Sequence, residues 1–131
     1  MTDITKLIVQ TLHKAFSDCE IYTETIPQGF RQPCFSVLQI DGSAQEYPNE
    51  RIFLSMNFDV RFFPEKRQQC REMAVSLTAL LRTLPGLCGR DISWQITDNV
   101  LHFFVTYEQI LQETEAAVAM EILTISTGGK A

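Results

Sequence analysis

The sequence has few of the residues that usually build disulfides, metal sites or catalytic centres. Its 131 residues include only four cysteines and two histidines. The cysteines are Cys19, Cys34, Cys70 and Cys88, and no two of them form a CxxC pair. The chain does not open with a signal-peptide pattern either. We therefore expect buried thiols in a protein that stays in a reducing compartment.

Long apolar runs and an excess of positive charge are also missing. The longest purely apolar run has only a few residues, whereas a membrane-spanning helix needs about twenty, so we expect a soluble protein without a membrane partner. The net charge is −5. A negative field repels phosphate backbones, and Arg51, Arg61 and Arg90 are scattered among acidic residues, so we expect no sequence-specific nucleic-acid binding.

Motifs for catalysis are absent too. His13 and His102 fall on different expected elements, and neither lies near a GxSxG turn, so nucleophilic catalysis has no basis in the sequence. There is no P-loop, dinucleotide fingerprint or HExxH helix. The acidic pair Glu113 and Glu115 lies in a polar stretch and should stay solvated. We expect no enzymatic activity, no cofactor and no metal.

Residues 50–65 are the most informative stretch, because apolar and polar residues alternate there with a period of two. This pattern predicts a long strand, closed by Pro64, with one buried face. The even positions should face the core: Ile52, Leu54, Met56, Phe58, Val60 and Phe62. The odd positions should face water or a partner subunit: Ser55, Asn57, Asp59 and Arg61.

This strand should be longer than the domain that contains it. At about 3.3 Å per residue it measures roughly 43 Å, whereas a domain of this size is about 36 Å across. It must therefore bend strongly or project. A projecting end carries unpaired backbone groups, which make an adhesive edge.

The first of two predicted helices covers residues 2–16. Thr2 or Asp3 can cap its first turn. Its core-facing stripe consists of Ile4, Leu7, Ile8, Leu12, Ala15 and Phe16.

The second predicted helix begins after Pro64, with Glu65 near its amino end, where a negative charge suits the helix dipole. Pro85 and Gly86 stop it. Its apolar stripe predicts that this helix covers the sheet. The stripe consists of Cys70, Met73, Ala74, Leu77, Leu80, Leu81 and Leu84.

Further strands complete the sheet. A short strand is predicted within residues 19–25, and alternation after Pro33 predicts another that ends at Asp41 and Gly42. A polar loop, residues 43–49, should follow it. Residues 90–97, with Ile92, Trp94 and Ile96 on one face, and residues 100–112 should form a hairpin around Asp98 and Asn99, which both tolerate left-handed backbone.

These elements predict one α+β domain over residues 1–131: an antiparallel-rich, mixed sheet with both main helices packed on one face. We expect a loop or short helix at residues 114–119, a last strand at residues 120–126 and a frayed tail at residues 127–131.

A turn rich in special residues joins the first two predicted strands. Gln28, Gly29 and Phe30 lie between Pro27 and Pro33, and glycine permits the positive φ that an ordered turn needs. Phe30 either plugs the core beneath the turn, which is the more ordinary interpretation, or is displayed.

This turn, followed by Pro33-Cys34-Phe35, resembles the tail terminator family of long-tailed phages and prophages. The other shared features are the first helix, the Phe62-Phe63-Pro64 step at the end of the long strand, the second helix and a hairpin strand that opens with residues 100–103. Asp98-Asn99 stands where an Asp-Gly pair is expected. The resemblance runs from the first helix to about Gln112.

The resemblance implies a structural subunit of a ring, commonly hexameric, that caps the tail tube and offers a surface to head-completion proteins. Its partners would be copies of itself, the tail tube protein and a head-completion protein, in a virion tail assembled in the bacterial cytoplasm. The alternative is a non-enzymatic adaptor or minor head–tail connector module of the same fold.

The expected interaction residues are Gln28, Gly29 and Phe30 in the turn, with Asn57, Asp59 and Arg61 on the long strand. Neighbouring subunits should meet through the projecting strand ends or through the loop at residues 43–49.

Overall fold

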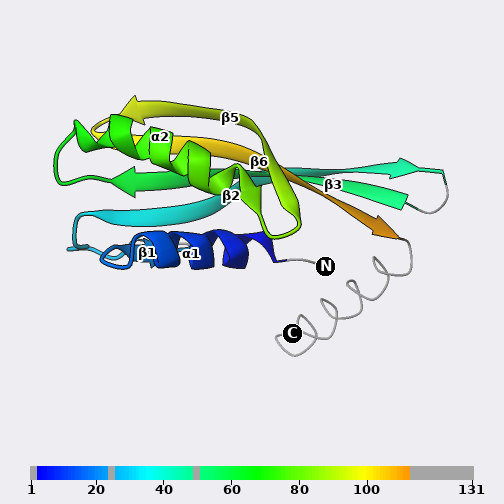
Figure 1. The fold of residues 1–131 in the computed structure, drawn as a ribbon, viewed down its shortest axis with the longest axis horizontal. Coiled ribbons are helices and arrows are strands. Elements are labelled where there is room, and N and C mark those ends of the chain that lie inside the picture. Colours follow the sequence, from blue (N-terminus) through cyan, green and yellow to red (C-terminus); the bar gives the residue numbers. More distant parts are fainter. Residues whose placement is uncertain (1–2, 24–25, 49–50, 113–131) are drawn as a thin grey trace.

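The computed structural model describes residues 3–23, 26–48 and 51–112. The elements predicted at residues 114–119 and 120–126, and the tail at 127–131, lie outside the described residues. In Figure 1 the helices lie against one side of a twisted sheet, and part of the sheet extends past them.

Within the described residues the sheet has six strands, in the order β1-β2-β3-β6-β5-β4. Its β1 runs parallel to β2, and every other neighbouring pair is antiparallel. The prediction of a mixed, antiparallel-rich sheet is confirmed. The strands are β1 (Glu20–Tyr22), β2 (Cys34–Tyr47), β3 (Arg51–Phe63), β4 (Thr83–Leu84), β5 (Leu87–Thr97) and β6 (Val100–Gln112).

Helix α1 (Ile4–Ala15) forms where the apolar stripe predicts it. The Asp3 side chain accepts a hydrogen bond of 3.1 Å from the backbone N–H of Lys6, which satisfies one of the free donors in the first turn. Ile4, Ile8 and Leu12 are buried, so the stripe faces the sheet as expected.

Helix α2 (Gln69–Leu81) begins later than the sequence suggests. The expectation that the helix begins directly after Pro64 is wrong, and Glu65 lies ahead of the helix. Residues 65–68 form a turn instead, in which the Gln69 Oε1 atom accepts hydrogen bonds from the backbone N–H groups of Glu65 at 2.9 Å and Lys66 at 3.1 Å. Gln68 already has helical angles (φ −61°, ψ −23°), so this turn leads directly into the helix.

Both helices pack on one face of the sheet, as predicted (Figure 1). One buried cluster joins the stripes of α1 and α2 to the sheet, through Ile8 and Leu12 on the first helix and Leu77 and Leu81 on the second. The sheet contributes Phe35, Val37, Phe58, Val60, Phe62, Leu101, Phe103, Val105 and Tyr107. Burying such side chains contributes roughly 1.5–3 kcal/mol each.

The register predicted for β3 is confirmed by the burial of its even positions. Phe58, Val60 and Phe62 are at most 3% exposed. Met56 is partly buried against the same cluster, and Leu54 is half-buried. Burial falls toward the amino end of β3 because the helices do not extend over that end (Figure 1).

Strand β2 is longer than predicted, and this corrects the loop expected at residues 43–49. Residues 43–47 pair in register with residues 51–55 of β3. A register shift between Gln39 and Asp41 marks a bulge where the alternation in β2 breaks. The pairing uses backbone groups that every residue carries, so the polar composition of this stretch does not prevent it.

The three longest strands continue past β5, whose pairing with β6 reaches only Gly89 opposite Tyr107. Beyond that level lie residues 43–47 of β2, 51–55 of β3 and 108–112 of β6, which we call the arm. The arm projects beyond both helices (Figure 1). The length of β3 required it either to bend strongly or to project from the domain, and it projects.

The hairpin between β5 and β6 turns as predicted. Asp98 and Asn99 have φ angles of 52° and 62°, the left-handed values that a two-residue turn needs. Trp94 and Ile96 pair with Phe103 and Leu101, which places them on the helix-covered face, but Trp94 remains 47% exposed.

Candidate interaction surface

The turn at Gln28-Gly29-Phe30 lies at the end of the sheet opposite the arm. Gln28 and Gly29 are exposed, and Gly29 has a φ of 71°. The Phe30 ring is half-buried and packs edge-on against Phe63, with the ring centroids 5.1 Å apart. Phe63 follows the buried Phe62 and so lies on the sheet face away from the helices. The expectation that Phe30 plugs the core is therefore wrong.

The odd positions of β3 share that uncovered face, so the structure brings both groups of predicted interaction residues onto one surface. Along β3 the row runs through Asn57, Asp59, Arg61 and Phe63, and Phe30 packs at its end. We call this surface the β3 track.

Asn57 joins three strands at one end of the β3 track. Its Nδ2 group donates a hydrogen bond to the Asp41 carboxylate on β2. Its Oδ1 atom accepts one from the Thr106 hydroxyl on β6. These partners hold the amide in one orientation, because its N–H group meets an acceptor and its oxygen meets a donor.

Asp59 lies in the middle of the track and is unexpectedly buried, with its side chain only 7% exposed. Its Oδ2 atom accepts a hydrogen bond of 3.1 Å from the Arg61 Nε group and lies 3.1 Å from the Nδ1 atom of His102. Among the described residues, the other oxygen, Oδ1, has no hydrogen-bond partner. Asp59 thus carries a buried acceptor that could receive a donor from another molecule.

The partners from β2 and β6 were not predicted as part of the site. His102 was expected only to lie on a sheet face, which it does, and its ring stacks on Phe104 with an interplanar angle of 15°. Asp41 and Thr106 carry no sequence motif. Only strand pairing places these side chains beside the β3 track: Asp41 and Thr106 pair with Asn57, and His102 pairs with Arg61.

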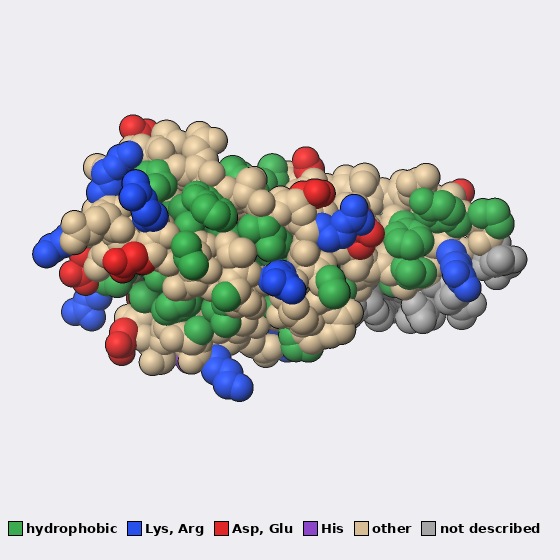
Figure 2. All heavy atoms as spheres, turned by 45° about the horizontal axis from the view of Figure 1, so that its top comes forward, with side chains coloured by type: hydrophobic (Ala, Val, Ile, Leu, Met, Phe, Trp, Pro, Cys, Tyr) green, Lys and Arg blue, Asp and Glu red, His purple; other side chains and the backbone are tan. Residues whose placement is uncertain are grey.

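An apolar patch lies at the other end of the same face, on the arm. Phe53 pairs with Ile110 on β6, and the Tyr47 ring packs edge-on against Phe53 with a centroid distance of 5.1 Å. Tyr47 is 43% exposed and Ile110 is 51% exposed. We call these three residues the arm patch. Figure 2 shows hydrophobic side chains also gathering on the arm in the view that it presents.

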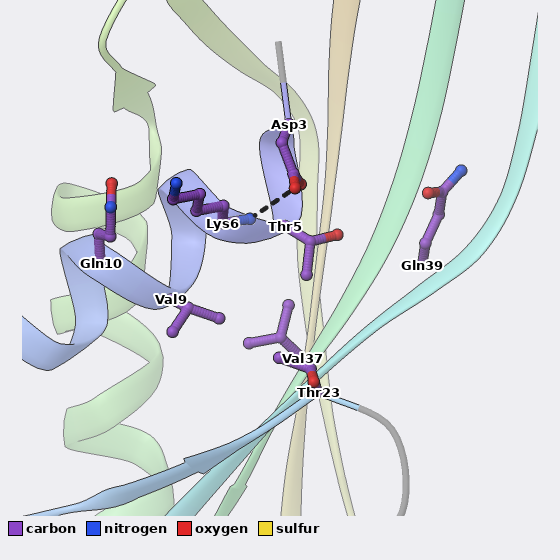
Figure 3. A pocket seen from close by; sticks show the side chains of 8 residues that line it. All are labelled: Asp3, Thr5, Lys6, Val9, Gln10, Thr23, Val37 and Gln39. Carbon is purple, nitrogen blue, oxygen red and sulfur yellow. Dashed lines mark hydrogen bonds between the residues drawn. The ribbon is translucent and has the colours of Figure 1, made fainter. Parts of the chain in front are cut away.

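A groove runs between α1 and the outer side of β2 (Figure 3). It encloses about 670 Å³. Val9 on α1 and Val37 on β2 lie across from each other in it, and Asp3, Lys6 and Gln39 add polar groups. The groove is therefore lined by both apolar and polar side chains.

The four cysteines are free thiols, and Cys34 and Cys70 are buried as expected. The expectation of burial is wrong for Cys19, which is half-buried, and for Cys88, which is exposed. Burial raises the pKa of Cys34 to about 11, with the nearby Cys19 and Glu20 adding to the shift, so its reactive thiolate form is disfavoured near neutral pH. The described residues contain no group of three or more His, Cys, Asp and Glu side chains placed to hold a metal ion. In the described part of the chain, no helix is long and apolar enough to cross a membrane.

Comparison with known proteins gives one family match. The family model described as phage tail terminator protein matches residues 3–118. No curated protein matches the chain. The match includes every helix and strand of the described residues, together with every residue of the β3 track and the arm patch. The chain therefore belongs to the phage tail terminator family and is a structural component of a phage tail.

Proposed function

We propose that this tail terminator protein assembles into a closed ring, a hexamer, that ends the tail tube and offers a surface for joining the head. The observation that carries the proposal is the arm, a three-stranded extension beyond the helices that bears an exposed apolar patch. Monomeric proteins seldom leave contiguous apolar surface in water unless a partner covers it.

The proposed partners are copies of this chain, the tail tube protein and a head-completion protein, all within a virion tail that assembles in the bacterial cytoplasm. The role needs no catalytic group. The arm patch would contact the assembled tail, and the β3 track with Gln28, Gly29 and Phe30 would contribute polar contacts. The contacts made by the β3 track would be largely polar and therefore weak. The isolated protein would accordingly be monomeric when dilute.

The ring is tested by light scattering across a concentration series, together with capping of tail tubes purified from the same phage or prophage. Wild-type protein should change from monomer to a single closed species and should stop tube growth. Tyr47→Glu and Ile110→Glu place charges on the arm patch and should weaken capping at least tenfold. Val75→Glu is the matched control, because Val75 is 63% exposed on α2, away from the arm.

The β3 track needs a gentler substitution than charge reversal. Asp59 is buried beside Arg61 and His102, so reversing its charge would place like charges together and destabilise the fold. Asp59→Asn removes the charge while keeping the shape, and Arg61→Gln removes the charge while keeping a polar side chain. If either lowers capping without lowering the melting temperature, the track belongs to the contact surface.

One result would replace the ring by the alternative. If the wild-type protein stays monomeric at millimolar concentration and also fails to cap tail tubes, the ring does not form. The chain would then be a non-enzymatic adaptor or a minor head–tail connector module of the same fold.

A further inference from the structure

One long edge of the sheet is open in the described part of the chain. The short strand β1 pairs only with Cys34 to Ser36 of β2, so within the described residues the stretch 37–47 of β2 has no outer neighbour. Backbone groups that point outward from such an edge can pair with an added strand. The open stretch starts in the body of the domain and ends on the arm (Figure 1).

Two hollows follow this edge. The groove between α1 and β2, of about 670 Å³, begins beside Thr23, the residue after β1, and reaches Gln39 (Figure 3). A second hollow, of about 320 Å³, extends from Gln39 to Gly42 and Ala44 on the arm. Gln39 lines both, and a Cβ atom at Gly42 would lie 3.4 Å from its Nε2 atom. The two hollows therefore form one channel along the open edge of β2.

The arm end of this channel has room for the side chains of an added strand. Gly42 and Ala44 pair with Met56 and Leu54, which are even positions of β3, so all four lie on the side of the sheet that carries the helices. Glycine has no side chain and alanine has only a methyl group, so the half-buried Met56 and Leu54 form an apolar floor beside the edge. Every second side chain of an extended chain next to β2 would lean over this floor.

A bulge limits where a regular ladder can form. Gln39 pairs with Phe58 and Asp41 with Asn57, which leaves Ile40 as the extra residue, 53% exposed. Bulges interrupt strand pairing locally. Residues 41–47 pair with β3 without a further shift, and their backbone spans about 24 Å. The edge therefore suits a short extended segment on the arm.

We propose that residues 41–47 of β2 pair with an extended segment of the tail tube protein, which adds a strand to the arm. This inference rests on the proposed function and names the chemistry of the contact with the tube. The occupant follows from continuity, because the same arm bears the apolar patch that is proposed to meet the assembled tail. Backbone hydrogen bonds would supply affinity, and the channel would select a segment in which apolar and polar side chains alternate.

Cross-linking identifies the occupant of the edge. Cys19 and Cys88, which are not fully buried, are first replaced by serine. Ile40→Cys is then labelled with benzophenone maleimide and irradiated with tail tubes purified from the same phage or prophage. Mass spectrometry should find the label on one segment of the tail tube protein with alternating apolar and polar residues. Val75→Cys, at a position 63% exposed on α2, is the control and should not label that segment.

Hydrogen exchange tests whether the contact uses the backbone. The outward N–H groups within residues 41–47 should exchange at least tenfold more slowly when tubes are bound, because each gains a carbonyl partner. Contacts between side chains alone would not give these N–H groups hydrogen-bond partners. An unchanged exchange rate at residues 41–47 in protein bound to tubes would overturn the strand pairing.

Filling the channel tests the same contact by mutation. Ala44→Phe places a ring over the apolar floor, where the side chains of the segment would lie, and should weaken capping of tail tubes at least tenfold. Ala44 is exposed, so the melting temperature should change little. Val75→Phe adds the same ring on α2 and should cap like wild type. Capping at wild-type strength by Ala44→Phe would overturn the inference.

The outcomes separate this inference from the function on which it rests. Cross-links from Ile40→Cys that reach only this chain or another copy of it would show a different occupant and refute the inference, while the proposed function would stand. Wild-type protein that forms no ring and caps no tube would refute the proposed function itself, and the strand pairing with it.

Discussion

The hydroxyl group of Tyr107 on β6 donates a hydrogen bond to the backbone carbonyl of Leu81, the last residue of α2. Tyr107 is fully buried, and burial raises the pKa of its phenol. The bond satisfies a carbonyl at the helix end that has no partner within the helix. It also fixes the end of α2 over the strand that continues into the arm.

Tyr107→Phe should therefore destabilise the protein while keeping its shape. The variant leaves the Leu81 carbonyl without this donor, which costs about 1–2 kcal/mol. Urea unfolding followed by circular dichroism measures the change. Tyr47→Phe is the matched control, because Tyr47 is 43% exposed and should lose almost nothing. Equal stability of Tyr107→Phe and wild type would contradict the role given to this bond.

Gly89 should not accept a larger side chain. A Cβ atom at this position would lie 2.9 Å from both the Leu81 carbonyl oxygen and the Val105 Cγ2 atom, because β5 passes closely under the end of α2. Gly89→Ala should lower the free energy of unfolding by about 1–3 kcal/mol. At Gly42 the nearest atoms would be 3.4 Å away, so Gly42→Ala should have the smaller effect. The reverse order in thermal melts would argue against the close approach at Gly89.

Phe58→Asp tests the register of β3. Phe58 is 1% exposed in the core beside Tyr107, so the variant buries a charge without a partner and should unfold the domain. Val75→Asp, on the exposed side of α2, should melt within a few degrees of wild type. A Phe58→Asp protein that melted like the control would show that this residue faces outward.

The cysteines should differ widely in reactivity. At pH 8 iodoacetamide should alkylate the exposed Cys88 quickly and the buried Cys34 only after unfolding, which mass spectrometry of timed samples can follow. Burial raises the pKa of Cys34 from 9.0 to about 11 in the folded protein. The protonated thiol therefore stabilises the fold below pH 9, and this contribution is lost as the pH rises toward about 11. Rapid alkylation of Cys34 in folded protein would refute its burial.

The sequence alone was enough to predict the elements whose side chains repeat with a clear period. Alternation in residues 50–65 predicted β3 and its buried face, and helical spacing predicted α1 and the stripe of α2 up to Leu81. Leu84, which was assigned to that stripe, lies in β4 instead. Asp98 and Asn99 predicted the hairpin turn. These features are local, because each depends on one face of one segment meeting the core.

Only the tertiary structure decided how far β2 extends and what surrounds the β3 track. Residues 43–47 are exposed along their length, so no alternation marks them, and they are held by backbone pairing with residues 51–55. Asp59 is buried on the face without helices because Arg61 and His102 lie beside it, and His102 arrives from a strand 43 positions away in sequence. The alternation of apolar and polar residues in a sequence indicates which side chains contact the core. Backbone pairing and contacts between distant strands depend instead on which segments the fold brings together.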